Sequence, residues 1–442
     1  MNLKFWKSKP SPATTLPITA PYPAEKAESY DEIVGEGSIP LIVVEGFCGG
    51  AGNQLWGDFA DHLNAGFEGG KKRKTLFVKV GPVSSLHDRA CELFFTIRGG
   101  TVDYGEKHSE DHNHCRHGRV FRSGLYPQWS ATKPLHFLGH SMGGTTITKM
   151  QDLIKEGFFG DEYHPDMVLS VNTISAPFRG THAVYTLGEK PASAPDIRLF
   201  SVGSFIAMIV HFCMFFAPLL SEDPWDLLSE ARSYSCKDIS VVQFLKHVWK
   251  SGWAESEDIA PYDVTYQSVV TREKNGEGVV NKGTYYTSYA TNMTVPDHES
   301  TSGFTPSVSH FLNFPLFILS RAMCSYDLTR VHPFPDFVHA IQKGKDRDEL
   351  YKNDGVVPVF SQWHPLSCRE TKCVHHRALT HPSDPVAGEL VTGVWNVFTI
   401  EGATHASIVP RWTGSELQTT FFRGLGERLW FVEEKWTASR AA

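Results

Sequence analysis

The chain has 442 residues, of which 41% are apolar and 12% aromatic, so it holds enough apolar volume for a large folded core. Its formal net charge is −7, which offers no basic surface to a phosphate backbone and excludes nucleic acid as an expected partner. Eight cysteines in a chain of this length are too few for a disulfide scaffold.

Residues 1–37 are predicted to form a flexible, proline-rich tail. They contain no apolar run of the kind that a signal peptide needs, which favours a cytoplasmic location, with secretion as the alternative. The longest apolar stretch of the chain, residues 203–220, is slightly short for a membrane-spanning helix and contains a histidine. The sequence therefore predicts no transmembrane segment.

From Ser38 onward, short apolar runs bounded by Gly and Pro alternate with helical patterns. Continuous apolar runs are typical of strands that are buried on both faces of a parallel sheet. Apolar residues recur at helical spacing from Leu86 to Ile97 and from Ile147 to Phe158, which predicts crossover helices. We expect one doubly wound α/β domain over residues 38–442, with a helical insertion at about 185–262. Strands are expected at residues 40–47, 75–82, 134–139, 167–175, 284–291 and 394–400.

The segment GHSMG, residues 139–143, lies between a predicted strand and a predicted helix. A serine on such a tight turn stands above the sheet at the N-terminus of the helix, as in a nucleophile elbow. Its hydroxyl needs a general base and an orienting carboxylate, which follow in such folds in the order Ser, Asp, His. Asp354 in an Asp-Gly turn and His405 just past a predicted strand have that order. We therefore expect a triad of Ser141, Asp354 and His405.

Acyl transfer at a serine also needs N–H donors for the developing oxyanion. The backbone N–H of Met142, directly after the nucleophile, is one candidate. The second is the N–H of Phe47 in the glycine-rich loop VEGFCGG, which follows the first predicted strand.

Residues 101–119 contain four histidines, His108, His112, His114 and His117, among several acidic residues. A solvated loop rarely needs so much imidazole, so this segment is a candidate metal site. Spacing alone would pair His108 with His112, four residues apart on one helical face.

A second group of metal-ligating residues occurs in the segment CRETKCVHHRALTH. Its spacing matches no strong zinc template, so the segment is interpreted as a loop insertion, with a second metal site as the alternative. The residues concerned are Cys368, Cys373, His375, His376 and His381.

Seven segments spread in order between about residues 40 and 410 carry a family resemblance: GPVSSLHDRACELF, GGTVDYGEKH, HCRHGR, GHSMGG, TISAPFRGT, NDGVV and VWNV. Together they resemble the zinc-containing thermoalkalophilic bacterial lipases and their staphylococcal relatives. The resemblance implies the α/β-hydrolase fold and hydrolysis of triacylglycerols or other carboxylic esters, including substrates at a lipid–water interface. It also implies the same triad of nucleophile, acid and base as the order of the residues does.

The resemblance further implies one structural zinc ion per chain in a small subdomain at about residues 82–120. The implied ligands are Asp88, His108, His114 and Asp223, with Asp226 as the competitor for the fourth place. Choosing His114 over His112 requires a loop between the two ligand histidines, because a regular helix would hold residues six apart on divergent faces. His112 and His117 are then left to solvent or to supporting contacts.

Two positions depart from the family pattern. Glu45 stands where many relatives have a histidine before the glycine of the oxyanion loop, so the family's support of that loop does not carry over to this chain. Ser407 stands where the family has a calcium-binding glutamate, so no calcium is expected there.

Residues 203–220 match the position of the family's lid helix. A helix that covers the active site in water and opens on lipid is expected, with an ordinary buried helix as the alternative. Its apolar face would be formed by Phe205, Ile206, Ile209, Phe212 and Phe216.

Two other functions stay open. One is a carboxylesterase or acyltransferase that acts on soluble short-chain esters, and the other is a non-catalytic binding module with the same fold.

Overall fold

The computed structural model describes residues 38–50, 52–65, 72–198, 201–204, 256–300, 302–332, 335–343, 347–376 and 390–441. Several sequence predictions fall outside these described residues: the N-terminal tail, the lid residues Phe205, Ile206, Ile209, Phe212 and Phe216, the candidate ligands Asp223 and Asp226, and His381. Among the helices that are described, none is long and apolar enough to cross a membrane.

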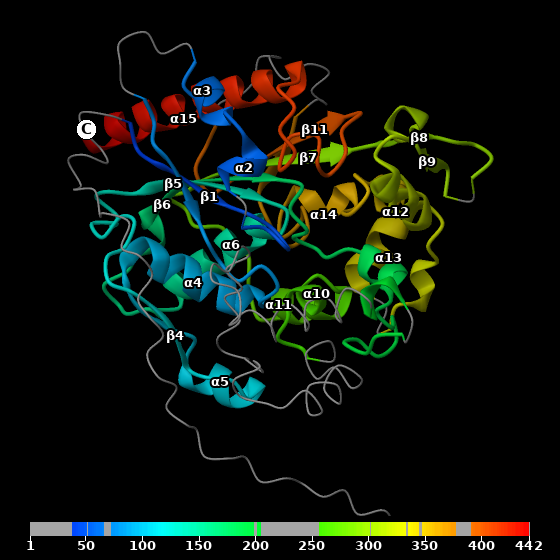
Figure 1. The fold of residues 1–442 in the computed structure, drawn as a ribbon, viewed down its shortest axis with the longest axis horizontal. Coiled ribbons are helices and arrows are strands. Elements are labelled where there is room, and N and C mark those ends of the chain that lie inside the picture. The colour runs from blue at the N-terminus through cyan, green and yellow to red at the C-terminus, as the bar shows by residue number, and fades with distance from the viewer. Residues whose placement is uncertain are drawn as a thin grey trace, which may run out of the picture.

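The centre of the fold is a seven-stranded sheet in which every pair of neighbouring strands is parallel (Figure 1). The predicted parallel sheet is thereby confirmed. Its spatial order is β10-β11-β7-β6-β5-β1-β2. The strands are β1 (Leu41–Val44), β2 (Thr75–Val78), β5 (Leu135–His140), β6 (Val168–Ile174), β7 (Tyr285–Asn292), β10 (Cys373–His375) and β11 (Trp395–Glu401).

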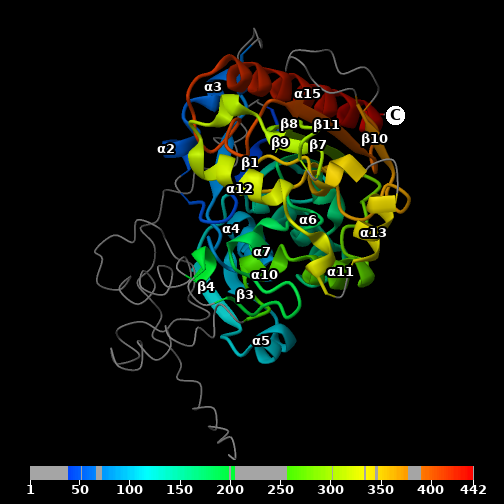
Figure 2. The same ribbon diagram turned by 90° about the vertical axis from the view of Figure 1, so that its right-hand side faces the viewer.

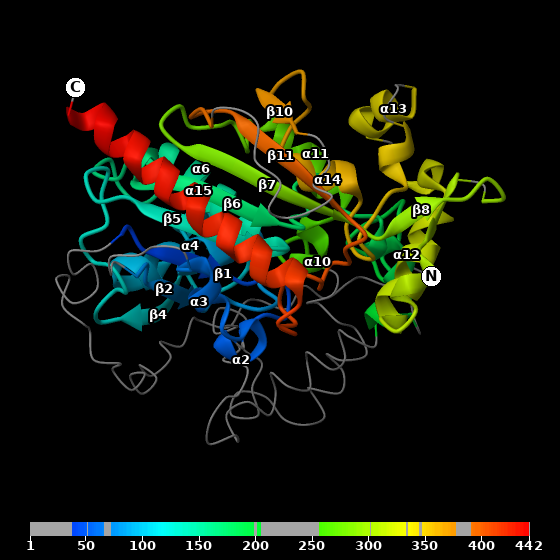
Figure 3. The same ribbon diagram turned by 90° about the horizontal axis from the view of Figure 1, so that it is seen from above.

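Helices cover both faces of the sheet. α4 (Leu86–Arg98) and α6 (Met142–Lys155) pack on one face, and α3 (Phe59–Leu63) and α15 (Glu416–Ala441) pack on the other (Figures 1 and 3). Alternate residues of β1 enter the two apolar cores, because successive strand side chains point to opposite faces. The core with α4 and α6 takes Ile42 and Val44, and the core with α15 takes Leu41 and Val43.

The remaining elements are short helices and strands outside the central sheet and its four covering helices. Figure 2 shows α5 (Glu106–His112) and the antiparallel pair β3 (Gly100–Asp103) and β4 (His117–Phe121) on the side of α4, at the end of the molecule opposite α15. The other remaining elements are α2 (Asn53–Trp56), α7 (Ala183–Leu187), α10 (Ala260–Asp263), α11 (Tyr266–Lys274), β8 (Thr294–Pro296), β9 (Phe304–Pro306), α12 (Phe314–Cys324), α13 (Asp336–Lys343) and α14 (Val359–Trp363). Short 3₁₀ helices lie at Pro165–Met167, Val308–His310, Leu328–Arg330 and Arg347–Leu350.

One predicted loop is wrong. The segment interpreted as a loop insertion around Cys368 contains β10, which pairs with β11 and forms an edge of the sheet. Its three residues are too few to give a strand pattern. Pairing with the longer strand β11 decides their conformation.

Candidate active site and metal clusters

Ser141 lies on the turn between β5 and α6. Its backbone has φ 54° and ψ −129°, a conformation that is costly for a residue with a side chain. Its N–H donates to the carbonyl of Ile174 at 2.8 Å, which fixes the turn to β6. A side chain at Gly143 would collide with the carbonyl of Val44, and one at Gly139 would collide with the backbone of Gly144. The two glycines of the motif are therefore required by packing, and they hold the serine in this strained position.

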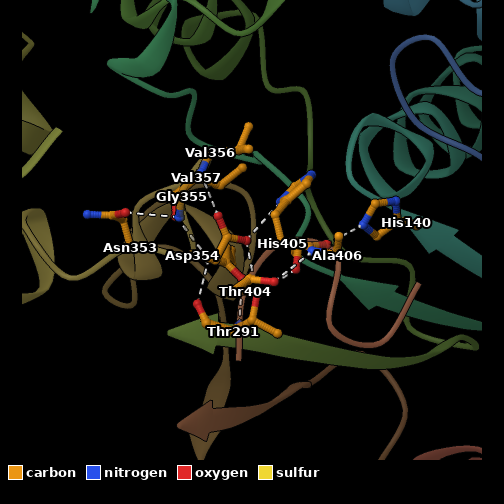
Figure 4. Close-up of polar contacts among 12 residues, drawn as sticks. His140, Thr291, Asn353, Asp354, Gly355, Val356, Val357, Thr404, His405 and Ala406 are labelled. Carbon is orange, nitrogen blue, oxygen red and sulfur yellow. Dashed lines mark hydrogen bonds and ion pairs between the residues drawn. The ribbon is translucent and has the colours of Figure 1, made fainter. Parts of the chain in front are cut away.

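His405 and Asp354 lie against each other (Figure 4). His405 Nδ1 is 2.8 Å from Asp354 Oδ2, and the backbone N–H of His405 donates to the carbonyl of Asp354 at 2.8 Å. Asp354 is fully buried. Its Oδ1 accepts from the N–H groups of Val356 and Val357, and its Oδ2 accepts from the Thr291 hydroxyl at 3.0 Å. The carboxylate thus fixes one ring nitrogen of His405 and leaves Nε2 for other contacts.

The charge of Asp354 is stabilised where it lies. Burial alone raises the pKa of this carboxyl, but the charge of His405 and the hydrogen bonds from His405, Val357 and Val356 outweigh burial and bring the pKa below its ordinary value. Asp354 is therefore ionised at neutral pH and can stabilise a protonated imidazole.

His140 is a positioning residue that sequence reasoning did not single out. Its Nε2–H donates to the backbone carbonyl of His405 at 3.0 Å, which ties the loop after β11 to the end of β5 beside Ser141 (Figure 4). Burial, helped by the neighbouring His405, lowers the pKa of His140 to about 3, so its ring is neutral. The only local signal for this role was its place next to the serine.

The loop after β1 lies against the serine. A Cβ on Gly46 would be 2.7 Å from Ser141 Cβ and 3.1 Å from Ser141 Oγ, so only glycine allows this approach. Phe47 and Met142, the expected sources of the oxyanion-hole N–H groups, belong to one apolar cluster. Met142 is also the first residue of α6, where backbone N–H groups have no partner within the helix.

Glu45 forms hydrogen bonds within the loop after β1 and to the helix α2. Glu45 is buried, and its carboxylate accepts from the N–H groups of Gly50 at 2.8 Å and Gly52 at 3.2 Å, and from Trp56 Nε1 at 3.1 Å. Burial raises the pKa of Glu45, and these three donors lower it in part. The guanidinium of the fully buried Arg89 also donates to the backbone carbonyl of Glu45. The loop is therefore held from both sides of Glu45.

We expect Glu45→Ala to lower kcat for the ester hydrolysis that the family resemblance implies by about ten- to a hundred-fold, because a loop that shifts by about 1 Å would misplace the N–H donor expected from Phe47. Glu45→Gln should lie between wild type and Glu45→Ala, since an amide oxygen still accepts from Gly50 and Gly52 while its NH₂ faces Trp56. Steady-state kinetics would measure the effect, with Glu434→Ala on the exposed face of α15 as the control. Equal kcat values for Glu45→Ala and the control would contradict this role.

Four residues far apart in the sequence form a candidate metal cluster. One donor atom from each of Asp88, His108, His114 and Asp258 lies within 4.8 Å of the other three. His108 Nε2 is 3.2 Å from Asp88 Oδ1 and 3.3 Å from Asp258 Oδ1, and His114 Nε2 is 3.4 Å from Asp258 Oδ2. Asp258 is the fourth member of this cluster among the described residues, and sequence reasoning missed it because no spacing links it to the histidines. The expected ligand Asp223 lies outside the described residues.

The two histidines converge by a route that differs from the predicted loop. α5 extends through His108 to His112, and Asn113 then adopts the left-handed conformation, with φ 55°. This turn brings His114 back toward the cluster. His114 Nδ1–H donates to the carbonyl of Cys115 at 2.9 Å, which leaves Nε2 as the lone-pair donor. His112 is not part of the cluster and neither is His117, whose Nε2 is 3.7 Å from Asp103.

A second cluster lies at the edge of the sheet. Three of its members, Cys368, Cys373 and His375, were named from the sequence, and the fourth was not. Its members are His364, Cys368, Cys373 and His375.

A parallel sheet flanked by helices, with a serine on a strained turn between strand and helix, defines an α/β-hydrolase. Residues 39–380 match the family model of the lipase-like C-terminal domain, and the chain belongs to this family. The predicted kinship with staphylococcal lipases is confirmed.

Two curated relatives show how far the likeness extends. Lipase 2 of Staphylococcus aureus is 28% identical over 355 residues, which are 74% of this chain and 45% of that protein. The lipase of Staphylococcus hyicus is 26% identical over 434 residues, which are 89% of this chain and 58% of that protein. The chain spans about half the length of the curated relatives it matches.

Solved structures have the same fold. The crystal structure of Staphylococcus hyicus lipase superposes with a TM-score of 0.65 at 22% identity, covering 90% of this chain and 96% of that one. EstA from Clostridium botulinum superposes with a TM-score of 0.60 at 26% identity, covering 94% of this chain and 91% of that one.

Proposed function

We propose that this protein is a serine esterase of the lipase type, which hydrolyses carboxylic esters through an acyl-enzyme on Ser141. The observation that carries the proposal is the 2.8 Å contact between His405 and the buried Asp354, in a loop that His140 ties to the strand bearing Ser141. Membership of a lipase-like family supports the same chemistry.

In the proposed mechanism, His405 Nε2 takes the proton of the Ser141 hydroxyl as its oxygen attacks the ester carbonyl. Asp354 holds the ring by Nδ1 and stabilises the imidazolium that forms. The N–H groups of Phe47 and Met142 donate to the oxyanion. His405 then passes its proton to the leaving alkoxide, and the acyl group stays on the serine. Water, deprotonated by the same imidazole, hydrolyses the acyl-enzyme and restores the hydroxyl.

The proposal includes one structural zinc ion held by Asp88, His108, His114 and Asp258. Zinc bonds of about 2.0–2.2 Å to N and O in a tetrahedron separate neighbouring donor atoms by about 3.3 Å. The three separations of 3.2–3.4 Å given above fit this geometry, and the separation of 3.9 Å between His114 Nε2 and Asp88 Oδ1 is longer. Zinc there offsets the charge of two buried carboxylates and joins α4, α5 and the segment before α10.

A substrate at a lipid–water interface is favoured by the apolar surface at α12. This helix adjoins the acid of the proposed triad, since a Cβ on Gly355 would contact Leu316 at 3.0 Å. Apolar side chains at half exposure or more gather there instead of being scattered singly, which is typical of an interaction surface. They are Val308, Phe311, Leu312, Phe314 and Ile318.

An ester series tests the proposal. Purified wild type should hydrolyse nitrophenyl esters and emulsified triacylglycerols, and an organophosphonate probe should label the peptide that contains Ser141. Ser141→Ala should be neither labelled nor active. Activity that is confined to dissolved short-chain esters would favour the carboxylesterase alternative. A folded wild type that neither reacts with the probe nor hydrolyses any ester would contradict the proposal and favour a non-catalytic binding module.

A further inference from the structure

We propose that His364, Cys368, Cys373 and His375 form a second metal site, which binds zinc through two thiolates and two imidazoles. The site shares no residue with the proposed triad or with the Asp/His cluster, and it lies where the end of α14 meets the edge strand β10. All four donor atoms lie within 4.8 Å of one another.

The distances suit zinc. Cys368 Sγ is 3.4 Å from His364 Nε2 and 3.5 Å from His375 Nε2. With Zn–S bonds of about 2.3 Å and Zn–N bonds of about 2.0–2.1 Å, a tetrahedral ion separates sulfur and nitrogen donors by about 3.5 Å. Two sulfur and two nitrogen donors in this arrangement select zinc over the hard cations, which prefer oxygen.

The side chain of His364 is oriented for metal binding. The residue is 1% exposed, and its Nδ1–H donates to the carbonyl of Pro365 at 2.9 Å. That hydrogen bond puts the lone pair on Nε2, the atom that faces Cys368. Histidines that bind metals are usually oriented by such a bond from the other ring nitrogen.

β10 supplies the other pair of donors. Cys373 and His375 are two residues apart on one strand, so their side chains leave the same face of the sheet, while Val374 between them is 47% exposed. His376 is excluded because its ring stacks on Phe398 with a centroid separation of 4.3 Å and its Nε2 is 3.0 Å from Asn396 Oδ1. The geometry thus resolves which of the two adjacent histidines can bind.

The site joins the sheet edge to the helix that braces Asp354. Gln362 of α14, two residues before His364, donates to the carbonyls of Thr291 and Val357 and accepts from the N–H of Thr291. Thr291 in turn donates to Asp354. A metal bound at His364 would therefore stabilise α14 and, through Gln362 and Thr291, the position of the Asp354 side chain. The three-residue strand β10 would gain a second attachment besides its pairing with β11.

Metal content of the full chain tests the proposal. Elemental analysis after extensive dialysis should find one zinc fewer per chain in Cys368→Ser and in Cys373→Ser than in wild type. His376→Ala, the matched control beside a ligand, should keep the wild-type content. Zinc that is lost in His114→Ala belongs to the Asp/His cluster, so Cys368→Ser combined with His114→Ala should lose both ions. A wild-type zinc content in Cys368→Ser would overturn the site.

Cobalt substitution keeps the test independent of whether a variant folds. Wild-type protein loaded with Co²⁺ should show a sulfur-to-cobalt charge-transfer band, which a cluster of carboxylates and imidazoles cannot give. Chelation in the His114→Ala background should also lower the thermal midpoint. A cobalt-loaded wild type without that band, or a mass and thiol count that show Cys368 and Cys373 joined in a disulfide, would overturn the proposal.

Discussion

Ser141→Ala and His405→Ala should each lower kcat/KM for ester hydrolysis by about ten-thousand-fold or more. Members of a triad act as one unit, so the loss of either removes nearly all of the covalent catalysis. Steady-state kinetics on a soluble ester, with circular dichroism to verify folding, would measure this. A folded His405→Ala with near wild-type turnover would show that another histidine is the base.

Asp354→Asn should be somewhat milder than either, because nucleophile and imidazole stay in place while the amide holds the ring in the wrong tautomer. Asp152→Asn is the matched control. Asp152 is also buried, lies in α6, and accepts from the N–H of Gly278 at 2.7 Å. Burial raises its pKa to about 7, so a neutral amide should be tolerated there. Equal losses in the two variants would point to general damage from replacing a buried acid.

His114→Ala should remove one zinc per chain and lower the thermal midpoint, whereas His112→Ala should change both little. Metal bound to the folded chain contributes directly to its free energy of unfolding, and His114 offers a donor atom to the Asp/His cluster while His112 does not. Elemental analysis and scanning calorimetry on the two variants would measure the difference. The opposite ranking would favour the pairing of His108 with His112 along one helical face.

The fourth ligand can be tested in the same assay. Asp258→Asn should lose the zinc that His114→Ala loses, and Asp223→Asn should keep it. Loss of zinc in Asp223→Asn but not in Asp258→Asn would show that Asp223, the residue that the family resemblance implies, is the fourth ligand.

The parts of the fold that local sequence encodes were predictable. Strands buried on both faces read as continuous apolar runs, and the glycines around Ser141 marked the turn because packing allows no side chain there. The hydrogen bond between Asp354 and His405 agrees with the pairing that chain order suggested. The strands and the serine turn can be recognised from a few neighbouring residues. The pairing of Asp354 with His405 follows from the order of catalytic residues that is common to the fold.

The parts that depend on tertiary contacts were not predictable. Asp258 becomes a candidate ligand only because segments far away in the chain lie beside it. His364 is close in sequence to its partners but lies before the segment CRETKCVHHRALTH. β10 is too short to give a strand pattern in the sequence, and its pairing with β11 makes it a strand. The turn to His114 depends on a single left-handed Asn113, where the sequence suggested a longer loop.

The strand order has a consequence for biosynthesis. β6 ends at Ile174, but its neighbour β7 begins only at Tyr285, so residues 175–284 must leave the ribosome before the edge of β6 is paired. At about 5–20 residues per second, this interval lasts roughly 5–20 s. An open strand edge is a template for pairing with other chains, so this edge of β6 is exposed to such pairing until β7 has been synthesised. Any product truncated there would carry the strained serine without either of its proposed partners.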